Sequence, residues 1–196
     1  MTDSAQPLVI EFETPRLRLR QWRESDRSPF ASMAADPQVM EFLLPLPTRA
    51  DSDASADRAR ALIAKNGWGF WAVEHKASGE FIGFTGLNVP LATLPFSPCV
   101  EIGWRLARQA WGQGFATEAA RGALQVGFDR LGLDEIVAFT AVGNLRSAAV
   151  MERLGMHEDV AGAFEHPLVP ERHVLRHHRL YRIGRSTWQA SRSVSG

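Results

Sequence analysis

The 196-residue chain contains one cysteine, one tyrosine and no net charge. Cys99 alone cannot form a disulfide within the chain, which fits a reducing compartment. Basic and acidic residues both number 22, so there is no global basic surface for nucleic acid or acidic membranes. No apolar run approaches the roughly 20 residues that span a bilayer, and the first residues lack the pattern of a secretory signal. We therefore expect a cytoplasmic monomer or homodimer that binds neither nucleic acid nor membrane.

Apolar residues recur with two different periods, which indicates a protein of mixed α and β structure. Alternation, as in residues 99–106, is typical of half-buried strands, and the spacing in residues 144–155 is helical. Because strands and helices are interspersed, we expect an α+β fold with a mixed sheet and helices on both faces. One domain is predicted over residues 14–188, after a loose leader over 1–13 and before a polar tail over 189–196.

The stretch RQAWGQGFATEAARGA, residues 108–123, carries the strongest functional signal. Gly112 and Gly114 flank one Gln, follow a strand-like run and open a helical one. Glycine permits a positive φ and the close approach of a ligand. The free N–H groups and the dipole at a helix start favour a phosphate there. The alternative is that these glycines only form a tight turn into a core helix.

Two nucleotide-binding motifs fit this stretch poorly. A P-loop ends in Gly-Lys-Ser or Gly-Lys-Thr, and the chain has no such ending. A dinucleotide fingerprint needs Gly or Ala where Thr117 stands, and an acidic residue at the end of the next strand. Asp134 and Glu135 instead precede that strand. A nucleotide-dependent oxidoreductase is therefore a weak alternative.

Residues 109–114, QAWGQG, match the Q/R-x-x-G-x-G/A signature of the GNAT superfamily of N-acetyltransferases. The longer run EIGWRLARQAWGQGFATEA resembles its ribosomal-protein branch, the RimJ/RimL type. Three further segments resemble that branch in the expected order: TPRLRLR at 14–20, NLRSAAVMERLGM at 144–156 and LYRIGRSTW at 180–188. The resemblance covers about residues 14–188.

This resemblance implies a six- or seven-stranded mixed sheet in which two neighbouring parallel strands splay apart. Those strands are 99–106 and 135–141, and acetyl-CoA, as co-substrate, would bind between them. The pantetheine arm would pair with the first strand, and the amides of the glycine loop would hold the pyrophosphate. The implied cofactor-binding residues are Trp104, Arg105, Leu106, Gln109, Gly112, Gln113, Gly114, Phe115, Ala116, Thr117 and Asn144.

Asn144 and Ser147 stand at the start of the helix in the 144–156 segment. Asn is a favoured N-cap, and the resemblance adds a hydrogen bond to the cofactor, so both roles stay open. Met151 occupies the position of the family's usual tyrosine. In members that lack this tyrosine, a serine is interpreted as the acid that protonates the leaving thiolate. The resemblance thus points to Ser147, although a first-turn serine is often only a solvated hydroxyl.

The general base has several candidates. Glu101 is the family-like one, although strand alternation also permits it to pair with Arg105. Glu165 and His166 lie where members of this branch place a carboxylate, and a water molecule can also relay the proton. The histidines at 166–178 match no zinc-binding spacing, so no metal is expected.

Together these features predict an N-acetyltransferase that uses acetyl-CoA. A primary amine, either a protein N-terminal α-amine or a small-molecule amine, would attack the thioester directly. Cys99 has neither a nearby base nor a lowered pKa evident in the sequence, so we expect it to pack rather than carry an acyl group. A non-catalytic acyl-CoA-binding regulatory module on the same fold is the alternative.

Overall fold

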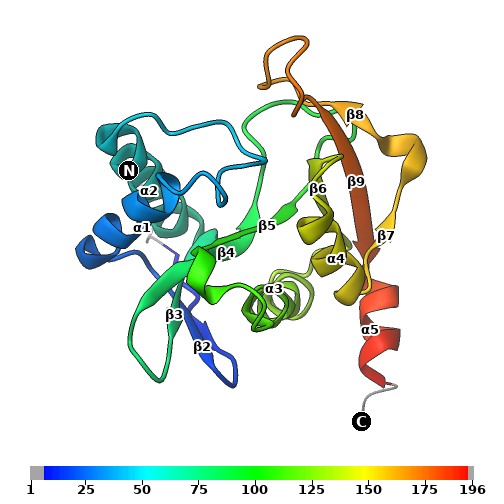
Figure 1. Ribbon diagram of the computed structural model, residues 1–196. Helices are drawn as coiled ribbons and strands as arrows, with labels where there is room; N and C mark the ends of the chain where they lie inside the picture. Colours follow the sequence, from blue (N-terminus) through cyan, green and yellow to red (C-terminus); the bar gives the residue numbers. More distant parts are fainter. Residues whose placement is uncertain (1–6, 194–196) are drawn as a thin grey trace, which may run out of the picture. The chain divides into compact units, whose positions relative to one another are not determined.

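The computed structural model describes residues 7–193, which form nine strands and five α-helices (Figure 1). The strands are β1 (Phe12–Glu13), β2 (Leu17–Arg20), β3 (Phe70–His75), β4 (Phe81–Asn88), β5 (Glu101–Leu106), β6 (Glu135–Ala141), β7 (His157–Glu158), β8 (Phe164–Glu165) and β9 (His177–Gly184). The helices are α1 (Arg27–Ala34), α2 (Arg49–Asn66), α3 (Phe115–Gln125), α4 (Leu145–Arg153) and α5 (Arg185–Ser193). A π-helical segment, Val126–Arg130, follows α3.

The strand order is β1-β2-β3-β4-β5-β6-β9-β7, with β8 also beside β9. β5 and β6 run parallel, with Glu101 opposite Val137, and the pairs on β9 are antiparallel. This confirms the mixed α+β sheet and its parallel central pair. Six strands have four or more residues; the sequence predicted β2 and β5 from alternation and the other four as strand-like or apolar runs. β1, β7 and β8 have two residues each, too few for a period.

The chain divides into two compact units. Unit 1 comprises the residues up to Glu41, Pro45–Gly86 and Trp104–Gly122, and unit 2 comprises Phe42–Leu44, Leu87–Gly103 and the residues from Ala123 onward. The chain passes from one unit to the other within β4, β5 and α3.

Helices cover both faces of the sheet in unit 1. On one face the ring of Phe84, in β4, lies 6.1 Å from the ring of Phe30, in α1. The neighbouring residue Gly83 is on the other face, opposite Val73 in β3. On that second face His75 packs against Phe115, the first residue of α3, with ring centroids 5.2 Å apart. The prediction of helices on both faces is therefore confirmed in this unit.

Unit 2 is built on the long antiparallel ladder between β6 and β9. It runs from Glu135 opposite Gly184 to Ala141 opposite His178. Helix α4 contacts β6, and α5 contacts β9. Trp188 of α5 is buried and stacks on Phe128. Helix α5 continues to Ser193, so the segment predicted to be a polar tail over 189–196 is helical up to that residue, and 194–196 lie outside the described residues.

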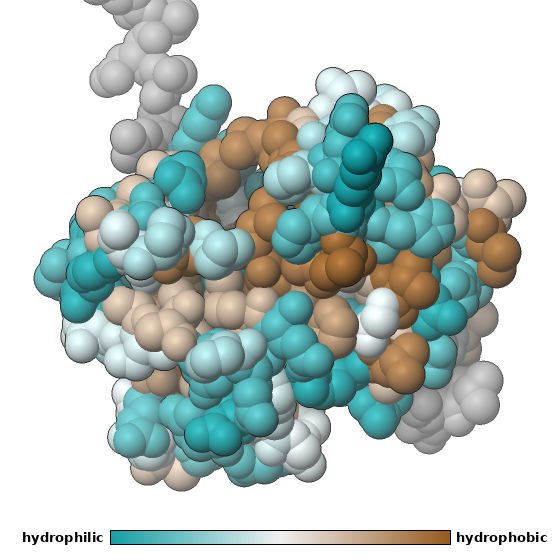
Figure 2. Space-filling view, turned by 45° about the horizontal axis from the view of Figure 1, so that its top comes forward, coloured by the Kyte–Doolittle hydropathy of each residue, from teal (hydrophilic) through white to brown (hydrophobic). Residues whose placement is uncertain are grey.

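Figure 2 shows apolar groups on the surface among polar ones. Leu91 and Val174 are 86% and 90% exposed. Isolated exposed apolar side chains are common on folded proteins. Within the described part of the chain, none of the helices is long and apolar enough to cross a membrane.

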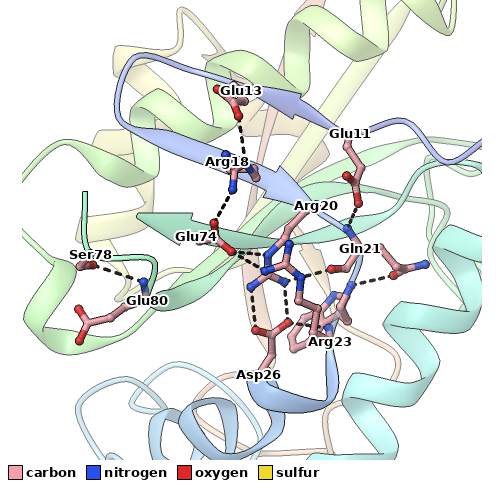
Figure 3. Close-up of polar contacts among 11 residues, drawn as sticks. Glu11, Glu13, Arg18, Arg20, Gln21, Arg23, Asp26, Glu74, Ser78 and Glu80 are labelled. Carbon is pink, nitrogen blue, oxygen red and sulfur yellow. Dashed lines mark hydrogen bonds and ion pairs between the residues drawn. The ribbon is translucent and has the colours of Figure 1, made fainter. Parts of the chain in front are cut away.

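A buried ion network joins β2, β3 and the turn before α1 (Figure 3). Arg20 is 2% exposed, and its guanidinium binds both carboxylate oxygens of Asp26, at 2.7 and 2.9 Å. Its Nε donates to Glu74 Oε2 at 2.7 Å. Burial raises the pKa of Glu74, but the hydrogen bond and charge of Arg20 outweigh it, so the pKa falls below its usual value. Both carboxylates thus neutralise the buried guanidinium.

Replacing Arg20 with Met is expected to lower the free energy of unfolding by about 3–5 kcal/mol, because the buried carboxylate of Asp26 then loses its counter-ion, whereas Glu74 keeps Arg18 and Arg23. The matched control is Arg49→Met, which removes an exposed i,i+4 pair with Asp53 and is expected to cost less than about 1 kcal/mol. Urea unfolding of both variants measures the difference. Equal losses in the two variants would show that the network contributes no more than a surface ion pair.

Candidate functional site

The glycine loop ends in two left-handed residues directly before α3. Gly112 has φ 74° and Gly114 has φ 80°, values that residues with a side chain rarely adopt. A Cβ built on Gly112 would meet no atom within 4 Å, so the space over its backbone is open. Helix α3 begins at Phe115, directly after Gly114. The turn is therefore a real feature, and its outer surface is open to a ligand.

The start of α3 presents backbone donors without helical acceptors. The N–H of Glu118 donates to the carbonyl of Gly114 at 3.0 Å and makes the first bond of the helix. The N–H groups of Phe115, Ala116 and Thr117 thus lack an intrahelical partner. Together with the helix dipole they suit a phosphate group. The predicted pyrophosphate residues therefore have the donor set that such a group requires.

Arg16 and Glu118 brace this loop, and sequence reasoning missed both. Arg16 Nε contacts Glu118 Oε2 at 2.6 Å, and its Nη1 donates to the carbonyl of Gln113 at 3.0 Å. Thr14 Oγ1 donates to Glu118 Oε1 at 2.6 Å. Burial raises the pKa of Glu118, but these donors outweigh it and lower the pKa, so the carboxylate stays ionised. The partners lie about a hundred positions apart in the sequence, so no local pattern reveals them.

Gln109 also helps to close the loop. Its carbonyl accepts a hydrogen bond from the Gln113 side-chain amide at 2.9 Å. Just before it, Arg108 pairs with Asp36 at 3.2 Å. The predicted role of Gln109 in binding the cofactor is therefore joined by a role in shaping the turn.

The second half of β5, Trp104–Leu106, lies in unit 1 beside β4. A Cβ on Gly83, whose φ is 141°, would collide with the carbonyl of Arg105 and lie 2.8 Å from Leu106 Cα. Glycine at position 83 thus allows the two strands to approach. Within unit 1 this half of β5 borders β4 alone, and an edge strand can pair with an extended ligand. The Leu106 carbonyl already accepts the Trp111 indole N–H at 2.8 Å.

In unit 2 Asn144 caps α4, as predicted. Its Oδ1 accepts the backbone N–H of Ser147 at 3.2 Å, and its Nδ2 donates to Thr140 Oγ1 at 2.9 Å. Ser147 is half-buried in the first turn. Met151, at the family's tyrosine position, is 2% exposed and belongs to the core. Asn144 is thus a structural cap, and its role toward a cofactor remains a prediction.

Glu101 lies at the start of β5 and is half-buried. Its Oε1 accepts a hydrogen bond from Asn88 Nδ2 at 2.7 Å. Burial raises the pKa of Glu101, and the hydrogen bond from Asn88 opposes this only in part. A carboxylate with a raised pKa is a stronger base, which suits proton abstraction. Asn88, like Arg16 and Glu118, is a residue that sequence reasoning missed.

The other base candidates have different surroundings. Glu165 is exposed and held by Arg176 at 3.0 Å and His177 at 3.1 Å. His166 lies in a ring cluster beside His178, with centroids 4.9 Å apart. Burial lowers the pKa of His166, so its imidazole is neutral at pH 7. Glu165 and His166 therefore both remain candidates for the general base.

Two further features concern nucleophiles and metals. Burial raises the pKa of Cys99, which disfavours the thiolate that a nucleophile needs. Among residues 7–193 there is no group of three or more His, Cys, Asp or Glu side chains that could hold a metal ion.

Comparison with known proteins adds an independent line of evidence. A family model described as Acetyltransferase (GNAT) domain matches residues 16–157. The chain is 33% identical over 145 residues to the uncharacterized protein YkkB of Bacillus subtilis, covering 74% of this chain and 83% of that protein. It is 32% identical over 161 residues to the FsC-acetyl coenzyme A-N(2)-transacetylase of Aspergillus fumigatus, covering 80% and 67%.

A solved structure shares the fold. Spermidine N-acetyltransferase from Vibrio cholerae, in complex with CoA and spermine, superposes with a TM-score of 0.69 at 20% identity. The match covers 89% of this chain and 98% of that chain.

Proposed function

This chain belongs to the GNAT family of acetyltransferases, and we propose from that membership that it acetylates the nitrogen of a primary amine by direct attack on acetyl-CoA. The family and its named relatives establish an acetyl-CoA-dependent acetyltransferase. The direct mechanism, the residue roles and the class of amine are the proposal.

The observation that carries the proposal is the open turn at Gly112 and Gly114 with unpaired N–H groups at the start of α3. These amides would hold the pyrophosphate, and the backbone of Trp104–Leu106 would pair with the pantetheine arm. Asn144 would add a hydrogen bond from its side chain. A backbone N–H of β5 would polarise the thioester carbonyl, as an oxyanion site does.

In the proposed reaction the neutral amine nitrogen attacks the thioester carbonyl carbon. A C–N bond forms, the C–S bond breaks, and the acetylated nitrogen gives up one proton while the thiolate gains one. Glu101 would take the amine proton, directly or through water, because burial makes it a stronger base. Ser147 would give a proton to the thiolate. Holding both reactants together supplies much of the rate enhancement.

We further place the chain in the RimJ/RimL-like branch, on the four resembling segments between residues 14 and 188. That branch favours a protein N-terminal α-amine, whereas the Vibrio cholerae structure is named for spermidine, a small amine. A non-catalytic acyl-CoA-binding module would bind acetyl-CoA without acetylating any amine. Amine-dependent turnover therefore separates the two functions.

Acetyl-CoA at a hundred times its Kd is expected to stabilise the protein by about 2.7 kcal/mol. Gly114→Glu is expected to abolish this stabilisation, because the side chain occupies the phosphate position and adds a like charge. Gly155→Glu is the matched control, since Gly155 also has φ 80° with no atom near its Cβ position. Thermal melts with and without acetyl-CoA measure both. If acetyl-CoA stabilises Gly114→Glu and the control equally, the loop is only a structural turn.

Glu101→Gln is expected to lower kcat/KM, with a deficit that grows as pH falls from 8 toward the pKa of Glu101. Over that range an amine of pKa near 7.7–8.0 becomes protonated and depends more on the base. Below the raised pKa, Glu101 itself is protonated and the parent also slows. Asn88→Leu removes the hydrogen bond that lowers this pKa, so the acidic limb should move to higher pH. Identical pH profiles for parent and Glu101→Gln would exclude Glu101 as the base.

Ser147→Ala is expected to lower kcat by about 10²-fold or more, the contribution typical of a positioned proton donor. The KM for acetyl-CoA and the unfolding free energy should change little, because Ala is favourable in a helix. Ser32→Ala, at an exposed helical position in α1, is the control. Steady-state kinetics with one amine that the parent acetylates measure kcat for each variant. A parental kcat in Ser147→Ala would assign the proton donor to water or another group.

A further inference from the structure

Arg105 is a half-buried cation without an anionic partner. Its guanidinium carbon lies 5.3 Å from the centre of the Phe84 ring, and its Nε is buried without a hydrogen bond. Within residues 7–193 no carboxylate forms an ion pair with it. Burial lowers the pKa of Arg105 to about 10, so the side chain is still charged at neutral pH.

The cost of such a charge is evident beside Arg20 in the same unit. Arg20 is buried, and Asp26 and Glu74 both bind it. A desolvated charge without an anionic partner is costly, and the face of an aromatic ring offsets only part of that cost. The protein thus keeps a partly desolvated guanidinium at Arg105 that a bound anion would neutralise.

The sheet separates Arg105 from the glycine loop. Arg105 shares its face with Phe84, whereas Leu106 approaches Gly83 on the opposite face. Gly83 is opposite Val73 in β3, and His75, two residues on, packs against Phe115 at the start of α3. The loop that suits a phosphate therefore lies on the other face. The pyrophosphate is accordingly not the anion for Arg105.

The surroundings of Arg105 favour a single carboxylate. The ring of Phe84 lies within 6.1 Å of the rings of Trp22, Phe30 and Phe70. The neighbouring cations on this face, Arg20 and Arg23, are already paired with Glu74. One free positive charge matches one negative charge, and a guanidinium fork matches the two oxygens of a carboxylate.

We infer that the acceptor is an amine that also carries a carboxylate, and that Arg105 binds this carboxylate beside the ring of Phe84. The inference rests on the proposed function and specifies its acceptor. Arg105 is thus a specificity residue for the acceptor and takes no part in binding acetyl-CoA through its side chain.

The test uses acid and amide pairs of primary amines: the standard amino acids except proline, β-alanine and γ-aminobutyrate, each with its amide. The parent is expected to acetylate preferred acids with kcat/KM about 10- to 100-fold above the amides, the range for one charged hydrogen-bonded pair. Arg105→Met should lose this preference through a higher KM for the acids. Its kcat/KM should fall much less for the amides than for the acids, and its KM for acetyl-CoA should not rise, because the substitution keeps the backbone of β5. Comparing the ratio between variants cancels the different amine pKa values of acid and amide.

Arg23→Met is the control, since it removes a cation from the same face but one already paired with Glu74. Arg105→Lys keeps the charge without the fork, and it should retain part of the preference; it also serves if Arg105→Met does not fold. Melts with the same acids and amides report binding without turnover. Stabilisation by acids alone, lost in Arg105→Met, supports the inference.

Three results would overturn the inference: equal use of acids and amides by the parent, an equal loss for both in Arg105→Met, or a raised KM for acetyl-CoA in that variant. Acetylation of no amine at all is a different result and contradicts the proposed function. In that case the melts still decide whether Arg105 binds a carboxylate. If none of the acids stabilises the protein, the inference that Arg105 binds a carboxylate is contradicted.

Discussion

The first turn of α3 is the constraint on which the proposed activity depends. A helix start exposes N–H groups that need acceptors, and here the left-handed residues Gly112 and Gly114 form the turn before it, with open space over Gly112. Glu118 could compete for those donors, but Thr14 and Arg16 hold its carboxylate. The brace therefore fixes the turn and leaves the amides to an external phosphate. This division of roles explains why a carboxylate in the first turn is compatible with an anion site.

Two arginines of unit 1, the buried Arg20 and the half-buried Arg105, show how charge pairing separates structure from specificity. Arg20 has two carboxylate partners, and together they hold β2, β3 and the turn before α1. Arg105 has the ring of Phe84 and an unpartnered Nε. An ion with full pairing contributes to the fold, whereas an ion without pairing raises the free energy until a ligand supplies the partner. Arginine thus has a structural role at position 20 and a proposed role in binding the acceptor at position 105.

Local patterns predicted the long elements and the turn, because their causes lie within a few residues. Alternation predicted β5, the cap at Asn144 is formed with Ser147, and the glycine turn lies directly before α3. The contacts that sequence reasoning missed join distant segments: Arg16 with Glu118, and Asn88 with Glu101. Neither contact leaves a period or spacing in the sequence. The roles of Ser147 and Glu101 depend on a bound amine, so they stay predictions.

The central claim is that acetyl transfer requires an amine, and one stoichiometric measurement tests it directly. Purified protein is mixed with acetyl-CoA and a panel of amines, including peptides with varied N-termini; released thiol is followed by a thiol reagent and N-acetyl product by mass spectrometry. The account predicts one thiol and one N-acetyl product per turnover with at least one amine, and negligible thiol release without amine. Thiol release that no amine increases, with no acetylated product, would contradict it.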